Sequence, residues 1–479
     1  MRVSALPALS ALLAAGCGTD TPASDEDAGL DASSADTATQ DVSADDVADE
    51  DGESDVTDAG AEEDAEDNTA DVTAPDTGED VDDIEEEVTP DAGDNCPGDR
   101  LPYFGDEGNP IEIPIDGQAI MLGTWDGREG VRYLLDTGAQ ITSYDIDLTD
   151  GAVTFFTAGI TDLGTTVLCD VPSKGRDLAE AEAYIGVNID ALLGQSALRD
   201  AYMYIDYETE RSWVYDNDPF ENGVSAPPGS VALEDAEAGA PAVMPYELQN
   251  ELPVATMTLT GGVEVALLTD TGSGVTLLER SFFDAMQAAH GEPLPRLEGY
   301  VWATNFGTDE SFITRIPSMD VGGRAVEGEW AVVVPDDNHI AALLEGSGVF
   351  VDGFLGYPVY RQFVTEVRGP ETEFRFWPTA SDTAYPDEWH RVGLELVQRA
   401  GVNIVEMIFS PSSVATSEIA LHDVLLSVDG ASVDGLGLDA IRRLLRGTPG
   451  DERALTLQRA ESEETYEVTV LVDDLLPPL

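Results

Sequence analysis

Basic residues are scarce in this sequence. Lys and Arg together number 22, against 96 Asp and Glu, which gives a formal net charge of −74 at pH 7. Lys174 is the only lysine. A chain this acidic is repelled by the phosphates of nucleic acids and by anionic lipid headgroups. We therefore expect no nucleic-acid partner, and contact with a membrane only through an attached lipid.

Cysteine and histidine are also scarce, with three and four residues. The histidines form no His-Glu-x-x-His pattern and Cys96 and Cys169 have no neighbouring ligands, so neither a metal nor another cofactor is expected. In an exported protein Cys96 and Cys169 could pair, but the sequence does not fix their separation, and both states remain open. Neither a Gly-x-Ser-x-Gly motif nor a phosphate-binding glycine loop is present, which argues against the enzymes that depend on them.

Long apolar runs are missing as well, and no segment is long enough to span a bilayer. Residues 1–16 combine one basic residue with a short apolar stretch, which is typical of a secretory signal. The small residues before Cys17 resemble the lipobox of bacterial lipoproteins. This resemblance implies cleavage before Cys17, lipid on Cys17, and export to the cell envelope of a bacterium. Gly18 follows the cysteine, which favours the outer membrane.

The segment after Cys17 is strongly acidic. Residues 20–95 contain 31 Asp and Glu and neither Lys nor Arg. Such a segment cannot bury enough apolar surface to offset the entropy lost on ordering, and its charges repel one another. We interpret residues 17–97 as a lipidated cysteine followed by a disordered tether.

One short phrase occurs twice in the remaining chain. An apolar strand-like run leads into Asp136-Thr137-Gly138, and a second leads into Asp270-Thr271-Gly272. A threonine, Thr142 or Thr276, follows each phrase at the same distance. A second pair of matching segments lies downstream, Ile189 to Gly194 and Val351 to Gly356. A long internal period of this kind indicates a duplicated unit.

These residues resemble the retropepsin-like and pepsin-like aspartic proteases, in a form that carries both lobes in one chain. The resemblance implies catalysis by Asp136 and Asp270, with Thr137, Gly138, Thr271 and Gly272 supporting the two loops. One carboxyl is ionised and the other protonated, because like charges about 3 Å apart cannot both ionise. Which Asp carries the proton is left open. Two copies in one chain make a dimer unnecessary, so we expect a monomer.

The rest of the chain divides by composition. Short alternating apolar segments with glycine-containing turns predict β-strands. We assign residues 98–222 to the first lobe, 223–240 to a linker rich in Pro, Ala and Gly, and 241–380 to the second lobe. Residues 281–290 predict a helix that ends at Gly291. Segments 155–167 and 300–313 are candidates for hairpins that cover the substrate.

Residues 389–475 resemble a PDZ domain of bacterial envelope proteases. The resemblance rests on Val392-Gly393-Leu394, on the run from Ile419 to Gly430, and on a predicted helix at 438–445. It implies that Val392, Gly393 and Leu394 bind the C-terminus of a peptide, which adds a strand to the sheet edge.

The sequence therefore predicts a mainly β, two-lobed acid-protease fold, followed by a PDZ domain and preceded by an acidic tether. We expect an aspartic endopeptidase that acts on extended or unfolded polypeptides, with the PDZ domain recruiting a substrate or partner. The alternative is a non-catalytic envelope lipoprotein, in which the duplicated fold is a relic and acts as a binding scaffold.

Overall fold

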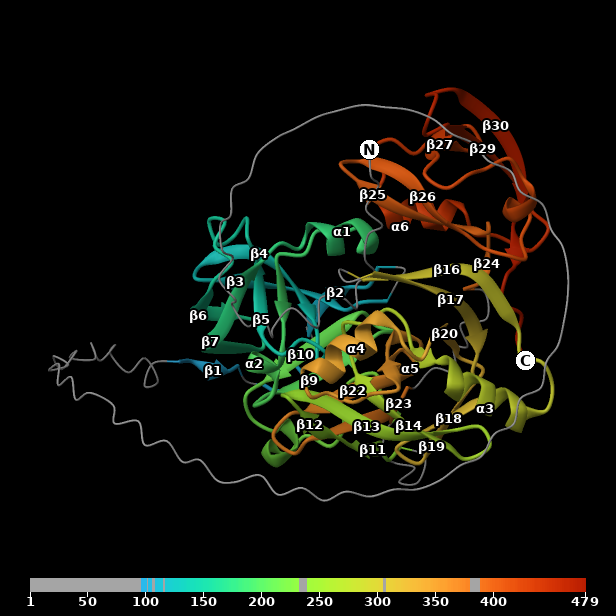
Figure 1. Cartoon of the computed structure of the whole chain (residues 1–479). Helices are drawn as coiled ribbons and strands as arrows, with labels where there is room; N and C mark the ends of the chain where they lie inside the picture. Colours follow the sequence, from blue (N-terminus) through green and yellow to red (C-terminus); the bar gives the residue numbers. More distant parts are fainter. Residues whose placement is uncertain are drawn as a thin grey trace, which may run out of the picture. The chain divides into compact units, whose positions relative to one another are not determined.

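The chain is mainly β (Figure 1), and the two lobes that precede its C-terminal module share a similar order of elements, with further strands and a further helix in the second. The computed structural model describes residues 96–100, 102–105, 108–114, 117–231, 239–304, 307–379 and 388–479, which belong to one compact unit. The signal, the lipidation site Cys17 and almost all of the tether lie outside the described residues. Among the described residues no helix has the length and apolar character needed to cross a bilayer.

The described residues of the first half form ten strands and two helices. They are β1 (Gly98–Asp99), β2 (Asn109–Glu112), β3 (Ile120–Trp125), β4 (Arg128–Leu135), β5 (Thr142–Asp145), β6 (Phe155–Asp162), β7 (Thr166–Arg176), α1 (Ala179–Ile185), β8 (Ala191–Leu193), α2 (Gln195–Leu198), β9 (Tyr202–Asp206) and β10 (Arg211–Tyr215).

The second half follows a 3₁₀ turn at Pro219–Asn222. Its elements are β11 (Ala242–Pro245), β12 (Glu247–Gln249), β13 (Leu252–Leu259), β14 (Val263–Thr269), β15 (Leu277–Glu279), α3 (Arg280–His290), β16 (Arg296–Thr304), β17 (Gly307–Arg315), β18 (Ser318–Val321), β19 (Arg324–Glu327), β20 (Trp330–Val334), α4 (His339–Gly346), β21 (Gly353–Leu355), α5 (Tyr357–Tyr360), β22 (Phe363–Arg368) and β23 (Glu373–Pro378). The predicted helix at 281–290 is α3, and its C-terminal residue is followed by Gly291 in the left-handed conformation.

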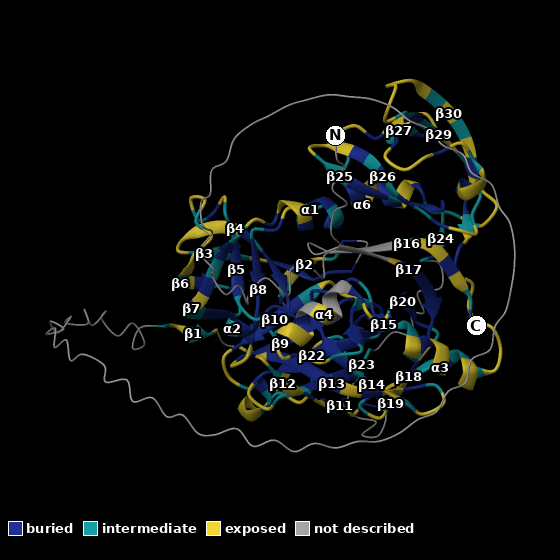
Figure 2. Cartoon of the chain, viewed as in Figure 1, coloured by how far each residue is buried: buried dark blue, intermediate teal, exposed yellow. Residues whose placement is uncertain are grey.

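The two halves share one sheet. Strand β9 of the first half pairs antiparallel with β22 of the second, with Ile205 opposite Thr365. The strand order across this region is β2-β10-β9-β22-β23-β11. All residues of β9 and β22 are buried (Figure 2). The last hairpin of each repeat therefore joins the lobes, and the predicted two-lobed β fold is confirmed.

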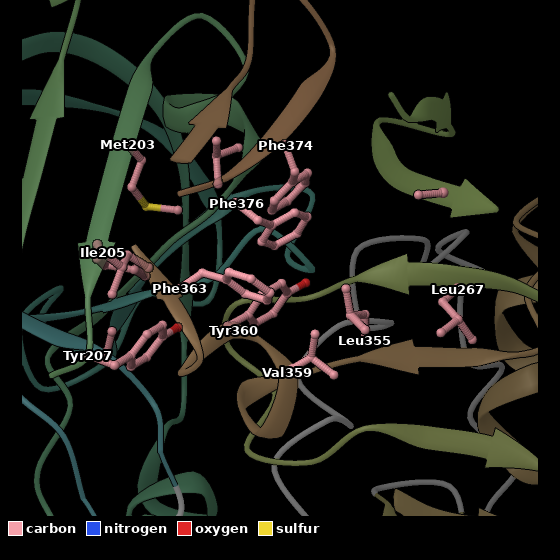
Figure 3. Close-up of a cluster of buried hydrophobic side chains, with 14 of the residues drawn as sticks. Met203, Ile205, Tyr207, Leu267, Leu355, Val359, Tyr360, Phe363, Phe374 and Phe376 are labelled. Atoms are coloured by element: carbon pink, nitrogen blue, oxygen red, sulfur yellow. The ribbon is translucent and has the colours of Figure 1, made fainter. Parts of the chain in front are cut away.

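A single apolar core continues across this junction. Met203 and Ile205 of β9 lie in the same cluster as Phe374 and Phe376 of β23 (Figure 3). Leu267 and Leu355 belong to the same cluster. Leu267 lies on β14, which leads into the Asp270 phrase, and Leu355 lies on β21, which pairs with β14. Burying large side chains on both sides of the junction fixes one lobe against the other.

The C-terminal module has its own core. Its elements are β24 (His390–Arg391), β25 (Leu394–Arg399), β26 (Val402–Ile408), a 3₁₀ turn (Val414–Thr416), β27 (Val424–Val428), β28 (Ala431–Ser432), α6 (Leu438–Leu444), β29 (Glu452–Gln458), β30 (Thr465–Leu471) and β31 (Asp473–Asp474). The sheet order is β25-β26-β27-β29-β30, and helix α6 packs against β25. A sheet with one helix against its first strand is the PDZ arrangement predicted from the sequence.

A disulfide joins Cys96 to Cys169, which resolves the alternative left open by the sequence. The bond ties residues that are 73 positions apart, the start of the described chain and strand β7. Closing a loop of this length reduces the entropy of the unfolded chain.

Replacing both cysteines with serine is expected to lower the free energy of unfolding by about 2–4 kcal/mol. Urea unfolding of the parent and the double variant measures this difference. Reductant should destabilise the parent by a similar amount and leave the double variant unchanged. Equal unfolding midpoints for oxidised parent and variant would show that the bond contributes nothing to stability.

Candidate active site

Each Asp-Thr-Gly phrase begins where a buried strand ends. Asp136 follows β4, and its backbone N–H donates to the carbonyl of Leu193, 3.1 Å away. Asp270 follows β14, and its N–H donates to the carbonyl of Leu355 at 3.0 Å. Both strands pair in parallel with the short strand that supplies this carbonyl, β8 or β21. The repeated downstream segment therefore holds the backbone at the start of each phrase.

The threonines of the two phrases bond the loops to each other. The hydroxyl of Thr137 donates to the carbonyl of Thr269 at 2.6 Å, and the hydroxyl of Thr271 donates to the carbonyl of Leu135 at 2.9 Å. Each hydroxyl oxygen also accepts from the other threonine's backbone N–H, at 3.0 and 3.1 Å. These four buried hydrogen bonds cross-link the two phrases and bring them together.

The glycines allow the two carboxyl groups to approach. A Cβ on Gly272 would lie 2.6 Å from the carboxyl carbon of Asp136, so no larger residue fits there without displacing that side chain. The N–H of Gly272 donates to the carboxylate of Asp270 at 2.9 Å. Gly138 takes the matching position beside Asp136, and its N–H lowers the pKa of that carboxyl. The carboxyl groups of Asp136 and Asp270 lie within hydrogen-bonding range of each other.

The two aspartates differ in acidity. Burial raises the pKa of Asp136 to about 6, and it would raise it further without the hydrogen bond to Asp270, the positive charge of Arg176 and the N–H groups of Gly138 and Ala139. Burial and the nearby charge of Asp136 raise the pKa of Asp270 well above its ordinary value. Burial and the mutual charge of the two carboxyls thus keep one proton on the pair at a pH at which an isolated aspartate has lost its own.

The threonine that follows each phrase has a matching structural role. Thr142 accepts the N–H of Gly194 at 3.2 Å, and Thr276 accepts the N–H of Gly356 at 3.3 Å. A Cβ on Gly356 would lie 2.0 Å from the carbonyl oxygen of Val275. The threonine spacing repeated in the sequence thus corresponds to the same hydrogen bond in both lobes. In each lobe it joins the segment after the Asp-Thr-Gly phrase to the glycine that ends the downstream repeated segment.

Arg176 is a site residue that sequence reasoning missed. It is the last residue of β7, 40 positions after Asp136, and no local motif marks it. Burial lowers the pKa of its guanidinium, and the charge of Asp136 opposes this effect. Strand β7 pairs in parallel with β5, which follows the first phrase, and Arg176 lies opposite Asp145 in this pairing.

Both predicted hairpins are present. Strands β6 and β7 form one in the first half, and β16 and β17 form the other. The tip of the second hairpin, residues 305–306, lies outside the described residues. The covering of substrate by either hairpin remains a prediction.

The three candidate peptide-binding residues of the PDZ module lie at the start of β25. Val392 and Leu394 are buried in the core of the module. The N–H of Val392 donates to the carbonyl of Leu445, and that of Leu394 donates to the carbonyl of Val392. Two of the three backbone donors expected to capture a carboxylate are therefore engaged within the module itself.

Groups suited to a metal ion are not found in the part of the chain that the structure describes. No cluster of three or more His, Cys, Asp or Glu side chains has the required arrangement there. The aspartate pair therefore stands without a metal centre among the described residues.

No protein-family model and no curated protein matches this chain. Among solved structures, the aspartic proteinase of Irpex lacteus is similar over 58% of this chain and 98% of its own, with 12% identity and a TM-score of 0.36. The PDZ domain of the carboxy-terminal protease from Vibrio cholerae, solved with a peptide, is similar over 17% of this chain and 92% of its own, with 21% identity and a TM-score of 0.17. The photosystem II D1 C-terminal processing protease is similar over 20% of this chain and 25% of its own, with 20% identity and a TM-score of 0.18. Similarity at this level assigns neither a family nor an activity.

Proposed function

We propose that this chain is an aspartic endopeptidase that hydrolyses peptide bonds in extended or unfolded polypeptides. The proposal rests on one observation: two buried carboxyl groups, one from each half of the chain, lie within hydrogen-bonding range on loops that threonines cross-link. A plain turn containing Asp has no need of a second buried acid beside it.

The difference in acidity gives each aspartate a role. Ionised Asp136 takes a proton from a water molecule while the oxygen of that water attacks the peptide carbonyl carbon. Protonated Asp270 donates its proton to the carbonyl oxygen as negative charge develops there. The tetrahedral intermediate then collapses: Asp136 gives the proton it took from water to the amide nitrogen, the C–N bond breaks and the amine leaves, and Asp270 takes back a proton from the hydroxyl of the new carboxylic acid. The pair titrates as one unit, so both groups are needed in each step.

Incubating the purified chain with a denatured, fluorescently labelled protein between pH 3 and pH 8 tests the proposal. We expect internal cleavage, identified by mass spectrometry of the fragments, and inhibition by a pepstatin-type compound. Turnover should increase as the pH rises through about 6, where Asp136 ionises. Intact substrate at every pH would favour the alternative, a non-catalytic binding scaffold.

Replacing Arg176 with glutamine is expected to move the acidic limb of the activity profile to higher pH. The guanidinium favours the ionised form of Asp136, and its removal raises the pKa of that carboxyl. The measurement is kcat/KM against pH for parent and variant. Lys174→Gln is the matched control, because it removes a cation two positions away on the same strand that contributes no shift to Asp136. Equal acidic limbs in the parent and Arg176→Gln would contradict this role.

We further propose that the peptidase is exported and held at the envelope by lipid on Cys17, with the acidic segment as a spacer. The signal-like start, the lipobox-like residues and the lack of basic residues in 20–95 support this. Metabolic labelling with a radioactive fatty acid tests it, since Cys17→Ser should abolish incorporation. In the same view the PDZ module recruits a substrate or partner through a peptide C-terminus.

A further inference from the structure

The PDZ module contacts both lobes of the proposed peptidase, and the two contacts differ in character. Strand β26 lies against β16 of the second lobe, and strand β25 lies against α1 of the first (Figure 1). Because the module contacts both lobes, the nature of each contact determines which lobe the module stays with when they separate.

The contact with the second lobe is apolar and extensive. One buried cluster contains residues of both partners. The module and its flanking segments contribute Trp389, Met407, Phe409, Leu475 and Leu476 to this cluster, and the second lobe contributes Leu297, Ile313, Trp330 and Val332 among others. Glu298 and Ser410 exchange two backbone hydrogen bonds, at 2.7 and 2.9 Å. The guanidinium of Arg315 donates to the carbonyl of Leu476 at 2.7 Å. The module is thus a fixed extension of the second lobe.

The contact with the first lobe contains more polar groups. The hydroxyl of Tyr184 donates to the carboxylate of Glu406 at 3.4 Å, and Arg442 donates to the carbonyl of Tyr184 at 3.2 Å. Gly186, which ends α1, packs directly on Leu438. Among the described residues no buried apolar cluster joins the first lobe to the module. A cavity of about 450 Å³ remains between α1 and the β25–β26 turn.

Helix α1 lies beside two elements of the module, strand β25 and helix α6. Among the described strands β25 pairs only with β26, so its other edge is free of strand partners. Helix α6 packs beside that strand, and a PDZ domain takes its peptide between such an edge and such a helix. Helix α1 contacts β25, and the residues at its end contact Leu438 and Arg442 of α6. The end of α1 therefore lies beside both elements that border this groove.

We propose that the β25–α6 groove holds the end of α1 as an internal ligand, and that a peptide C-terminus entering the groove displaces it. The module then stays on the second lobe and separates from the first. The contact with the first lobe gives way before the contact with the second, because no buried apolar cluster of the described residues joins it and its hydrogen-bonding groups can be satisfied by water. This proposal extends the recruitment role above by naming what the incoming peptide must replace.

Displacement of α1 reaches the catalytic loop through a short path. Ile185 of α1 belongs to a buried cluster with Leu192 of β8 and Leu134 of β4. The residue after Leu192 provides the carbonyl that holds the N–H of Asp136. Occupancy of the groove is thereby linked to the backbone that positions one carboxyl of the pair.

A glycine substitution tests the internal ligand. A Cβ at Gly186 would lie 2.4 Å from the Cβ of Leu438, a contact that side-chain rotation cannot relieve. Asparagine tolerates the left-handed backbone at this position, where φ is +80°. Gly186→Asn should therefore release α1 from the groove without a large backbone cost. Gly291→Asn is the matched control, because Gly291 also ends a helix with φ of +84° and has nothing within 4 Å of its Cβ position.

The binding experiment uses the full chain carrying Asp136→Asn, so that no probe can be cleaved. The probes are four fluorescein-labelled ten-residue peptides with one common polar sequence, ending in Ala, Val, Leu or Phe with a free carboxylate. Fluorescence anisotropy gives their affinities, and C-terminal amides of the same peptides serve as controls. We expect at least one free-acid peptide to bind the Gly186→Asn chain about tenfold or more tightly than the Gly291→Asn chain. In the Gly291→Asn chain the end of α1 still fills the groove, so only a small fraction of molecules is open to the peptide.

Hydrogen exchange gives the second readout. Adding the tightest peptide to the chain with native Gly186 should speed exchange of the α1 amides, and the Glu298 and Ser410 amides should remain protected. Equal peptide affinity for the two glycine variants, or no binding to either, would overturn the proposal, as would peptide binding that leaves the α1 amides unchanged. Because neither readout requires cleavage, an inactive wild-type chain would overturn the proposed peptidase while leaving this inference intact.

Discussion

Replacing either Asp136 or Asp270 with asparagine is expected to reduce peptide cleavage by about 10⁴-fold, the upper range for loss of a general acid–base group. Asparagine has nearly the same shape as aspartate but neither ionises nor releases a proton to the substrate. Losing one acid removes the shared proton, so the remaining carboxyl cannot act alone. The measurement is kcat/KM with the labelled denatured protein.

Asp190→Asn is a suitable control for this prediction. Asp190 lies in the repeated segment before β8, and its carboxylate accepts the backbone N–H of Arg132 at 2.9 Å. An amide oxygen can accept the same bond, so cleavage should change by less than about tenfold. Thermal unfolding of all three variants shows whether they remain folded. Substantial turnover by folded Asp136→Asn or Asp270→Asn would refute the proposed chemistry.

Replacing Glu366 with alanine is expected to destabilise the chain by about 3–5 kcal/mol, the usual cost of breaking a buried ion pair. Glu366 lies on β22 in the sheet that joins the lobes and is fully buried. Its carboxylate accepts from Trp377 at 2.6 Å, and from Tyr204 and Arg368 at 3.0 Å each. The substitution leaves all three donors without this acceptor in a region that water does not reach.

The position of Glu371 provides the comparison. This residue also pairs with Arg368, at 3.0 Å, but its side chain is 38% exposed. Exposed ion pairs contribute about 0–1 kcal/mol, so Glu371→Gln should leave stability nearly unchanged. Urea unfolding followed by tryptophan fluorescence measures both variants. Similar midpoints for Glu366→Ala and Glu371→Gln would show that the buried cluster does not stabilise the junction between the lobes.

Local patterns in the sequence predicted the strands and loops around the site well. The apolar run before each Asp-Thr-Gly phrase is a buried strand, and the paired downstream segments are the short strands that bond Asp136 and Asp270. Thr137 and Thr271 were expected to support the two loops, and their hydroxyls bond one loop to the other. These features were predictable because each depends on a few consecutive residues, and because the duplication presents every one of them twice.

Features that depend on distant residues were not predictable. Helix α1 was missed, because a seven-residue helix next to the strand segments carries little periodic signal. The roles of Thr142 and Thr276 were visible only as a repeated spacing, with no partner assigned. The PDZ residues Val392 and Leu394 were expected to present free N–H groups, whereas neighbouring carbonyls accept them. Such partners are set by packing between elements far apart in the chain.

The sequence by itself determined the duplicated catalytic-type loops, the mainly β class and the acidic, lysine-poor character of the chain, since strand periodicity, turn chemistry and net charge are properties of short segments or of composition. Only the tertiary structure decided that Asp136 and Asp270 share one buried site, that Arg176 lies near Asp136, that Cys96 pairs with Cys169 and that α1 contacts β25 of the PDZ module. Burial and Coulomb interactions set these outcomes, and both depend on distances in space between residues that the sequence leaves far apart.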